Sequence, residues 1–174
     1  MNSYYRAENI LPSNSLKALK DYVFDAESRF QPAKVTPVVP GFRVASVLFF
    51  PVLPTDIELI IQRHIELAAI AMSITLNSKI ETQITHTPNG GYFKRHLDNT
   101  IDNWRTLSYV LYFGKSIECG ELSIDIPGGR VQIAPCDNSI VVFPSNIHHE
   151  VLPVVCGDAF IDGRFTVNGW VGGL

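Results

Sequence analysis

The sequence has few charged residues and no excess of basic ones. Of its 174 residues, 18% are charged, and 14 Lys and Arg stand against 17 Asp and Glu, for a formal net charge of −3. Attraction to a phosphate backbone requires clusters of Lys and Arg. We therefore expect no nucleic acid among the binding partners.

Cysteine is scarce as well. The three cysteines, Cys119, Cys136 and Cys156, cannot all pair with one another. The residues before Pro12 also lack the charged segment and following apolar segment of a secretory signal. Both absences favour a location in the reducing cytoplasm.

A long apolar run is missing too. The most apolar segment, residues 55–76, is interrupted by Gln62-Arg63-His64 and by Glu66. A helix that spans a bilayer needs about 20 mostly apolar residues. We therefore expect a soluble helix there and no membrane partner.

What is present is the composition of a compact globular protein. The hydrophobic fraction is 46%, and no low-complexity tract or internal repeat is visible. A length of 174 residues suits one domain with one substantial core. We expect helical support over residues 1–79 and a β-rich core over residues 80–174.

Two amphipathic helices are predicted in the N-terminal part, at residues 15–29 and 55–76. The second opens with Thr55-x-x-Glu58, the pattern of a capping box, in which two side chains satisfy free backbone N–H groups. Between the helices, residues 42–50 favour a strand.

Short strands separated by turns follow from residue 80 onward, and Pro127-Gly128-Gly129 is the clearest hairpin signal. This order predicts a mainly β (α+β) fold with two facing sheets, a jelly-roll core supported by N-terminal helices. The pattern alone fits a sandwich equally well. The expected strands are residues 81–86, 92–95, 107–113, 121–126, 129–133, 139–143, 150–155 and 164–170.

An imidazole and a carboxylate stand two positions apart in His96-Leu97-Asp98. Side chains at positions i and i+2 of a strand share a face, so both can bind one ion. A second histidine would complete the two-histidine, one-carboxylate set that holds non-haem Fe(II) and leaves positions open for a co-substrate and dioxygen. Alone, so short a motif arises too often by chance to decide the function.

His148-His149-Glu150-Val151 offers the missing histidine. On an extended segment His149 and Val151 share one parity, which would place His149 on the same face as the inward apolar residues. We therefore predict His96, Asp98 and His149 as the metal ligands and the catalytic centre, in preference to His148.

Further motifs follow His96-x-Asp98 in a fixed order along the chain. They are Arg105-Thr106-Leu107-Ser108, Cys119-Gly120-Glu121-Leu122, Phe143-Pro144-Ser145, His149-Glu150-Val151-Leu152-Pro153-Val154 and Arg164-Phe165-Thr166 followed by Trp170. In this order they make residues 80–170 similar to the Fe(II)- and 2-oxoglutarate-dependent oxygenases, in particular to the prolyl 4-hydroxylase-like branch. The resemblance implies the double-stranded β-helix fold, with Fe(II), 2-oxoglutarate and dioxygen, and with ascorbate as a reductant.

The resemblance also implies a site for 2-oxoglutarate. The far carboxylate of this co-substrate needs a fixed cation, and Arg164 is the match, because a planar guanidinium binds a carboxylate bidentately. Thr166 would add a hydroxyl donor from the same strand face, and Leu122 would form part of the apolar wall. Tyr112 corresponds to a family tyrosine that hydrogen-bonds this carboxylate, although ordinary core packing explains it equally well.

Two features depart from the family pattern. Its Gly-Gly-x-Leu reads Cys119-Gly120-Glu121-Leu122, and a tyrosine about ten positions before the first ligand is replaced by His86 or Thr87. His86 either substitutes as a donor in the pocket or is structural. Trp104 either lines the entrance or caps the barrel.

Three functions fit these residues. The first is a hydroxylase of a peptidyl residue such as proline, and the second is the same oxygenase acting on a free amino acid or another small metabolite. The third is a non-catalytic, cupin-like metal-binding module, although a structural metal does not need the distant carboxylate anchor Arg164. Residues 31–40 and 99–104 are the loops expected to decide the substrate, and no motif indicates the oligomeric state.

Overall fold

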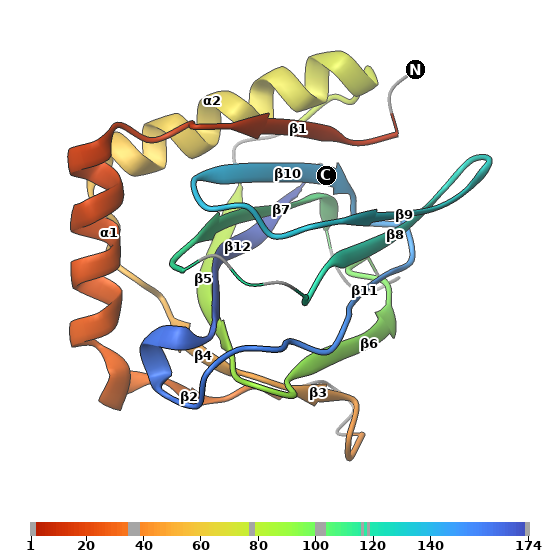
Figure 1. Cartoon of the computed structure of the whole chain (residues 1–174). Helices are drawn as coiled ribbons and strands as arrows, with labels where there is room; N and C mark the ends of the chain where they lie inside the picture. Colours follow the sequence, from red (N-terminus) through yellow and green to blue (C-terminus); the bar gives the residue numbers. More distant parts are fainter. Residues whose placement is uncertain are drawn as a thin grey trace.

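Two antiparallel sheets that face each other form the body of the protein, and both helices pack outside the larger sheet (Figure 1). The computed structural model describes residues 3–34, 39–76, 79–99, 104–115, 117 and 119–172. The jelly-roll architecture with supporting N-terminal helices, predicted from the order of short strands and helices, is therefore confirmed.

The larger sheet has seven strands in the order β1-β10-β7-β12-β5-β4-β2, and the smaller has five in the order β3-β6-β11-β8-β9. The strands are β1 (Tyr5–Glu8), β2 (Gln31–Pro32), β3 (Arg43–Val44), β4 (Ser46–Phe49), β5 (Ile80–Thr87), β6 (Tyr92–His96), β7 (Arg105–Phe113), β8 (Leu122–Ile126), β9 (Gly129–Ile133), β10 (Ser139–Pro144), β11 (His149–Val151) and β12 (Arg164–Gly172).

The larger sheet separates two apolar cores, because side chains alternate between the faces of a strand. Along β7, Leu111 and Phe113 belong to the core under the helices, whereas Tyr112 belongs to the core between the sheets. The helices α1 (Ser13–Asp25) and α2 (Thr55–Met72) close the first core. The opposite face of the larger sheet borders the space between the two sheets, and it carries both apolar and polar side chains.

Both helices end earlier than their apolar pattern predicts. α1 stops at Asp25 and is followed by a 3-10 turn, η1 (Glu27–Arg29). α2 stops at Met72, where Ser73 adopts a left-handed conformation with φ of 55°. No helix among the described residues is long and apolar enough to cross a membrane.

The capping box predicted at the start of α2 is wrong. Pro54 occupies the N-cap position, and no side chain caps the helix. The Pro54 carbonyl already accepts hydrogen bonds from the backbone N–H groups of Ile57 and Glu58, at 3.0 and 3.2 Å. Thr55 is thus the first helical residue rather than the cap, and its side chain lies one position too late for that role.

The single strand predicted at residues 42–50 is two strands in different sheets. β3 pairs with β6 in the smaller sheet, and β4 pairs with β5 in the larger one. Ala45 connects them, and its carbonyl accepts a hydrogen bond from the Ala33 N–H at 2.9 Å. This crossover brings β3 to the edge of the space between the sheets.

The other predicted strands are present, with ends shifted by a few residues. The hairpin at Pro127-Gly128 joins β8 to β9, where Ile126 pairs with Gly129. β11 begins at His149 and ends at Val151, before Pro153, which has no N–H to donate to a ladder. The short strands β1 and β2 were not predicted.

His86 faces the helices rather than the space between the sheets. Its ring is buried against Phe160 and Phe165, with ring centroids 4.4 and 4.9 Å apart, and Ser46 Oγ lies 3.3 Å from its Nδ1. Burial lowers the pKa of His86 to about 4. Its role is therefore structural, and Thr87 is the residue of this pair that reaches the cavity between the sheets.

This buried histidine makes stability depend on pH. In the unfolded chain His86 binds a proton below about pH 6.5, whereas in the folded protein it does so only near pH 4. The contribution of His86 to folding stability is therefore complete above pH 6.5 and falls as the pH drops toward 4. Between these values the free energy of unfolding should fall more steeply with decreasing pH in the wild type than in His86→Asn, by up to about 1.4 kcal/mol per pH unit. Urea unfolding at pH 7, 6 and 5 measures this slope. The exposed His148 provides the control, as His148→Asn; equal slopes in wild type and His86→Asn would contradict the assignment.

Candidate metal centre and adjoining cavity

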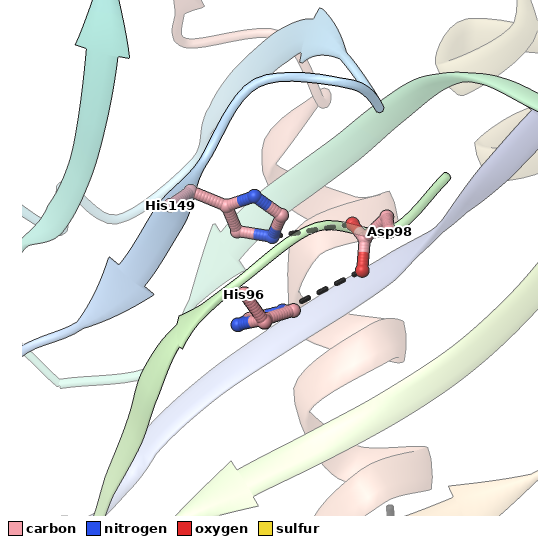
Figure 2. A group of neighbouring side chains, drawn as sticks. All are labelled: His96, Asp98 and His149. Atoms are coloured by element: carbon pink, nitrogen blue, oxygen red, sulfur yellow. Dashed lines mark ion pairs between the residues drawn. The ribbon is translucent and has the colours of Figure 1, made fainter. Parts of the chain in front are cut away.

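Three side chains from two distant parts of the chain meet between the sheets (Figure 2). His96 ends β6, Asp98 lies in the loop that follows, and His149 begins β11. Asp98 Oδ2 is 3.2 Å from His149 Nε2, and Asp98 Oδ1 is 3.5 Å from His96 Nε2. Their potential ligand atoms all lie within 4.8 Å of one another, which is a suitable arrangement for one metal ion.

A β-bulge aligns the two histidines. β6 and β11 pair Phe93 with Val151 and His96 with His149, so β6 has one residue more than β11 between these two pairs. The extra residue changes the parity of β6, and both Phe93 and His96 consequently face the cavity. The two rings stack with their centroids 3.6 Å apart.

Backbone carbonyl groups fix the orientation of both imidazoles. His96 Nδ1 lies 2.8 Å from the Lys94 carbonyl oxygen, and His149 Nδ1 lies 2.9 Å from that of Ile147. A carbonyl oxygen can only accept, so each Nδ1 carries the proton and donates it. In its neutral form each ring thus has its lone pair on Nε2, the atom that faces Asp98 and that a metal ion would bind. Without a metal ion, a protonated ring carries a second N–H at Nε2, which donates to the Asp98 carboxylate.

Two serines hold the carboxylate in place. Ser108 Oγ donates to Asp98 Oδ2 at 2.7 Å and lies 2.9 Å from Ser145 Oγ. The Asp98 N–H also donates to the Ser145 carbonyl at 3.1 Å. The loop after β6 is therefore fastened to β7 and to the end of β10.

The charges of the three groups are coupled. Burial alone would raise the pKa of Asp98, but hydrogen bonds with His149 and His96, together with their charges, hold it well below its usual range. Burial lowers the pKa of His96. It would also lower the pKa of His149, but the hydrogen bond with Asp98 outweighs burial and raises it. Asp98 is therefore ionised at neutral pH, as a metal ligand must be.

His148 and His149 have different surroundings. His148 is exposed, and its backbone carbonyl accepts a hydrogen bond from the Asp125 N–H at 2.9 Å. His149 is only 5% exposed and joins the pair of His96 and Asp98. Val151, two residues later, lines the same cavity, as its parity predicts.

Three of the four residues predicted to bind 2-oxoglutarate line this cavity, and the fourth, Tyr112, lies beside one of them. Arg164, Thr166 and Leu122 line it together with the three candidate ligands. Tyr112 is the cross-strand partner of Thr166, and its ring centroid lies 4.9 Å from Arg164 Cζ. The Thr166 hydroxyl donates to Asn168 Oδ1 at 3.3 Å, so a bond within the protein competes with the predicted donation to a co-substrate.

Arg164 and Tyr112 each carry a buried polar atom without a partner. Neither Arg164 Nε nor Tyr112 Oη has a hydrogen bond among the described residues, and no carboxylate there pairs with Arg164. Burial raises the pKa of Tyr112, although Arg164 opposes this, so its hydroxyl remains a donor at neutral pH. Unsatisfied buried donors are costly and therefore rare, so this pair indicates a missing acceptor. A carboxylate would satisfy both groups.

Gly120 allows the backbone to pass close to Arg164. Its φ is +88°, and a Cβ there would meet Val154 Cγ2 at 2.8 Å and Arg164 Cδ at 3.3 Å. Of the two positions that are glycine in the family motif, this is the one that requires it, which explains why Cys119 is tolerated at the other.

The other residues singled out in the sequence lie away from the cavity. The Trp104 ring packs over Gly172, where an added Cβ would overlap it, and the Lys79 ammonium group lies 4.4 Å from its centroid. Trp104 thus covers the end of β12 rather than the cavity. The two loops expected to decide the substrate lie partly outside the described residues, at 35–38 and 100–103.

Sequence reasoning missed several polar residues of the cavity. Arg43, Gln83, Thr85 and Asn168 line it, and none belongs to a motif with fixed spacing. Ser108 was part of the Arg105-x-x-Ser108 motif, but nothing in that motif indicates a bond to Asp98. The alternation of β5 would have placed Gln83 and Thr85 on one face, once Thr87 was known to face inward.

Known proteins share this fold and parts of this sequence. A curated relative, a PKHD-type hydroxylase from Synechocystis, is 28% identical over 190 residues, which cover 97% of this chain and 63% of that protein. The chain thus spans less than two thirds of the length of this relative.

Solved structures resemble the chain over almost its whole length. A prolyl-4-hydroxylase from Pseudomonas putida has a TM-score of 0.79 at 24% identity, covering 99% of this chain and 93% of that one. A prolyl hydroxylase from Trichoplax adhaerens, in complex with a hypoxia inducible factor peptide fragment, has a TM-score of 0.81 at 17% identity, covering 99% and 84%. At these identities the likeness is one of fold.

A sequence model of the 2OG-Fe(II) oxygenase superfamily matches residues 82–172, just over half of the chain. The matched region contains His96, Asp98, His149 and Arg164. The chain belongs to the 2OG-Fe(II) oxygenase superfamily.

Proposed function

We propose that the protein is an Fe(II)- and 2-oxoglutarate-dependent dioxygenase that hydroxylates a C–H bond of its substrate. The observation that carries this proposal is the meeting of His96, Asp98 and His149 beside the buried guanidinium of Arg164, whose Nε has no partner. When bound, Fe(II) and 2-oxoglutarate would supply the oxidation: the co-substrate becomes succinate and carbon dioxide, and dioxygen gives one oxygen atom to succinate and one to the substrate.

His96, Asp98 and His149 would hold the iron. Two imidazole Nε2 atoms and one carboxylate form the facial set that suits non-haem Fe(II) and leaves positions open for other ligands. The carbonyl groups of Lys94 and Ile147 keep the rings in the required tautomer.

Arg164 and Tyr112 would bind the far carboxylate of 2-oxoglutarate. A carboxylate between them would accept hydrogen bonds from Arg164 Nε and Tyr112 Oη, the two buried donors without partners. Leu122 would exclude water from the chain of the co-substrate. A non-catalytic metal-binding module would leave both buried donors unsatisfied, which favours the enzyme.

A peptidyl prolyl residue is the substrate that we propose. An outer cavity of about 860 Å³ opens beside the candidate ligands and is lined by Phe42, Phe93 and Trp170, with Arg105 Cζ 3.5 Å from the Trp170 ring centroid. This space exceeds what one amino acid fills, and apolar rings suit a pyrrolidine. The similar structures named as prolyl hydroxylases support the same choice. Ascorbate as a reductant and a cytoplasmic location stay predictions.

The metal assignment can be tested without a substrate. Anaerobic addition of Fe(II) and then 2-oxoglutarate should give a weak visible charge-transfer band, and His149→Ala should abolish it because a ligand is lost. His148→Ala, which changes the exposed neighbour, should retain the band. The opposite result for the two variants would contradict the assignment.

Arg164→Ala should weaken 2-oxoglutarate binding by about 10- to 100-fold, because a charged hydrogen bond contributes about 1.5–3 kcal/mol. Iron binding should persist, since no ligand changes. Titration of the charge-transfer band with 2-oxoglutarate gives the affinity, and Arg164→Lys should retain part of it. Unchanged affinity in Arg164→Ala would place the co-substrate elsewhere.

The substrate can be identified by mass spectrometry. Proline-containing peptides incubated with the enzyme, Fe(II), 2-oxoglutarate and air should gain one oxygen atom, and matched samples with His96→Ala should not. A mixture of free amino acids treated in the same way tests the alternative substrate. A gain in the amino acids and none in the peptides would overturn the prolyl proposal.

A further inference from the structure

A second guanidinium, that of Arg43, lies in the same site and has no role in the proposed chemistry. Arg43 belongs to β3, pairs with Phe93 of β6, and lines both the inner cavity and the outer one. His96 and Asp98 line both cavities too. Arg43 is thus located where a substrate would pass from the outer cavity to the metal.

Arg43 is held in place but forms no ion pair. Its Nη2 donates to Thr85 Oγ1 at 3.2 Å, and its Cζ lies 4.6 Å from the Phe93 ring centroid. The Thr85 hydroxyl in turn donates to Asn168 Oδ1 at 2.7 Å. Within the described ranges, however, no carboxylate lies within 4 Å of Arg43, and its buried Nε has no partner.

The charge of Asp98 acts on Arg43, but the two side chains form no ion pair, so the largely buried guanidinium lacks a direct anionic partner. Leaving such a charge without a partner is costly, so this arrangement indicates a missing anion. Burial and the charge of Arg164 lower the pKa of Arg43 while Asp98 raises it, and the result is about 10, so the side chain remains charged at neutral pH. Gln83, only 7% exposed, also lines both cavities, and its amide has no side-chain hydrogen bond among the described residues. It could serve as a second donor.

The charges of the loaded site lead to the same conclusion. In the proposed enzyme, the two positive charges of Fe(II) and the one of Arg164 balance the single negative charge of Asp98 and the two of 2-oxoglutarate. Arg43 then leaves the site with one positive charge in excess. A neutral substrate would not remove this excess, whereas a substrate with one carboxylate would.

We infer that Arg43 binds a carboxylate of the substrate, next to the carbon that is hydroxylated. This inference rests on the proposed function and refines its substrate class. The carboxylate has two possible sources: the C-terminal or free carboxyl group of the hydroxylated residue itself, or the side chain of an acidic residue directly beside it. A planar guanidinium whose Nε is unpaired suits either source.

The experiment compares acids with their neutral amides. The protein is loaded anaerobically with Fe(II) and saturating 2-oxoglutarate, which occupies Arg164, and the charge-transfer band establishes loading. Isothermal titration then measures dissociation constants for three probe pairs. They are L-proline and L-prolinamide, acetyl-Gly-Pro and its amide, and acetyl-Asp-Pro-amide and acetyl-Asn-Pro-amide.

We expect the acid of at least one pair to bind about tenfold or more tightly than its neutral partner, because a charged pair forms in a buried site. The pair that discriminates identifies the source of the carboxylate. Arg43→Gln should bring the ratio of the two constants close to one, and Arg43→Lys should give an intermediate ratio. Arg95→Gln, which removes an arginine paired with Asp125 outside both cavities, should leave the ratio unchanged.

Three results would overturn the inference: no binding by any acid, equal binding of acid and amide in every pair, or an unchanged ratio in Arg43→Gln. If the Arg43→Gln protein does not bind Fe(II) and 2-oxoglutarate, the ratio of acid to amide dissociation constants in Arg43→Lys is used instead. A ratio equal to that of the wild type would contradict the role of Arg43. A missing band in wild type would contradict the proposed function itself, whereas a band with equal acid and amide binding contradicts only the role of Arg43.

Discussion

The pairing of β6 with β11 is the constraint on which the site depends. It places His96 opposite His149, which lies 53 positions later in the chain, and the bulge in β6 turns both His96 and Phe93 toward the cavity. Without the extra residue, Arg95 would face His149. One irregularity in a ladder of hydrogen bonds thus decides which side chains meet.

The larger sheet supports this pairing through its two different faces. One face packs on α1 and α2 and is almost wholly apolar, whereas the other carries Arg164, Thr166 and Thr85 into the space between the sheets. Polar side chains can remain buried there because each strand separates them from the apolar core on its far side. The helices therefore stabilise the site without touching the candidate ligands.

Much of the fold follows from local patterns in the sequence. Alternation and turn residues predict most strands of the core, and the parity that His149 shares with Val151 is enough to distinguish it from His148. Local patterns fail where another residue, distant or adjacent in the sequence, takes the expected position or partner. Residues 42–50 read as one strand, yet β3 and β4 join different sheets, and Pro54 replaces Thr55 at the start of α2.

The family, the candidate ligand set and the cation near the co-substrate all follow from the order of residues along the chain, because these residues stand at fixed spacings around strands of recognisable pattern. The packing of the sheets was needed to identify Arg43 as part of the site and His86 as a core residue. The reason is physical: the strand crossover at Ala45 brings Arg43 beside Thr85, a residue of another sheet. A contact of that kind depends on how the two sheets lie against each other, and no local periodicity encodes it.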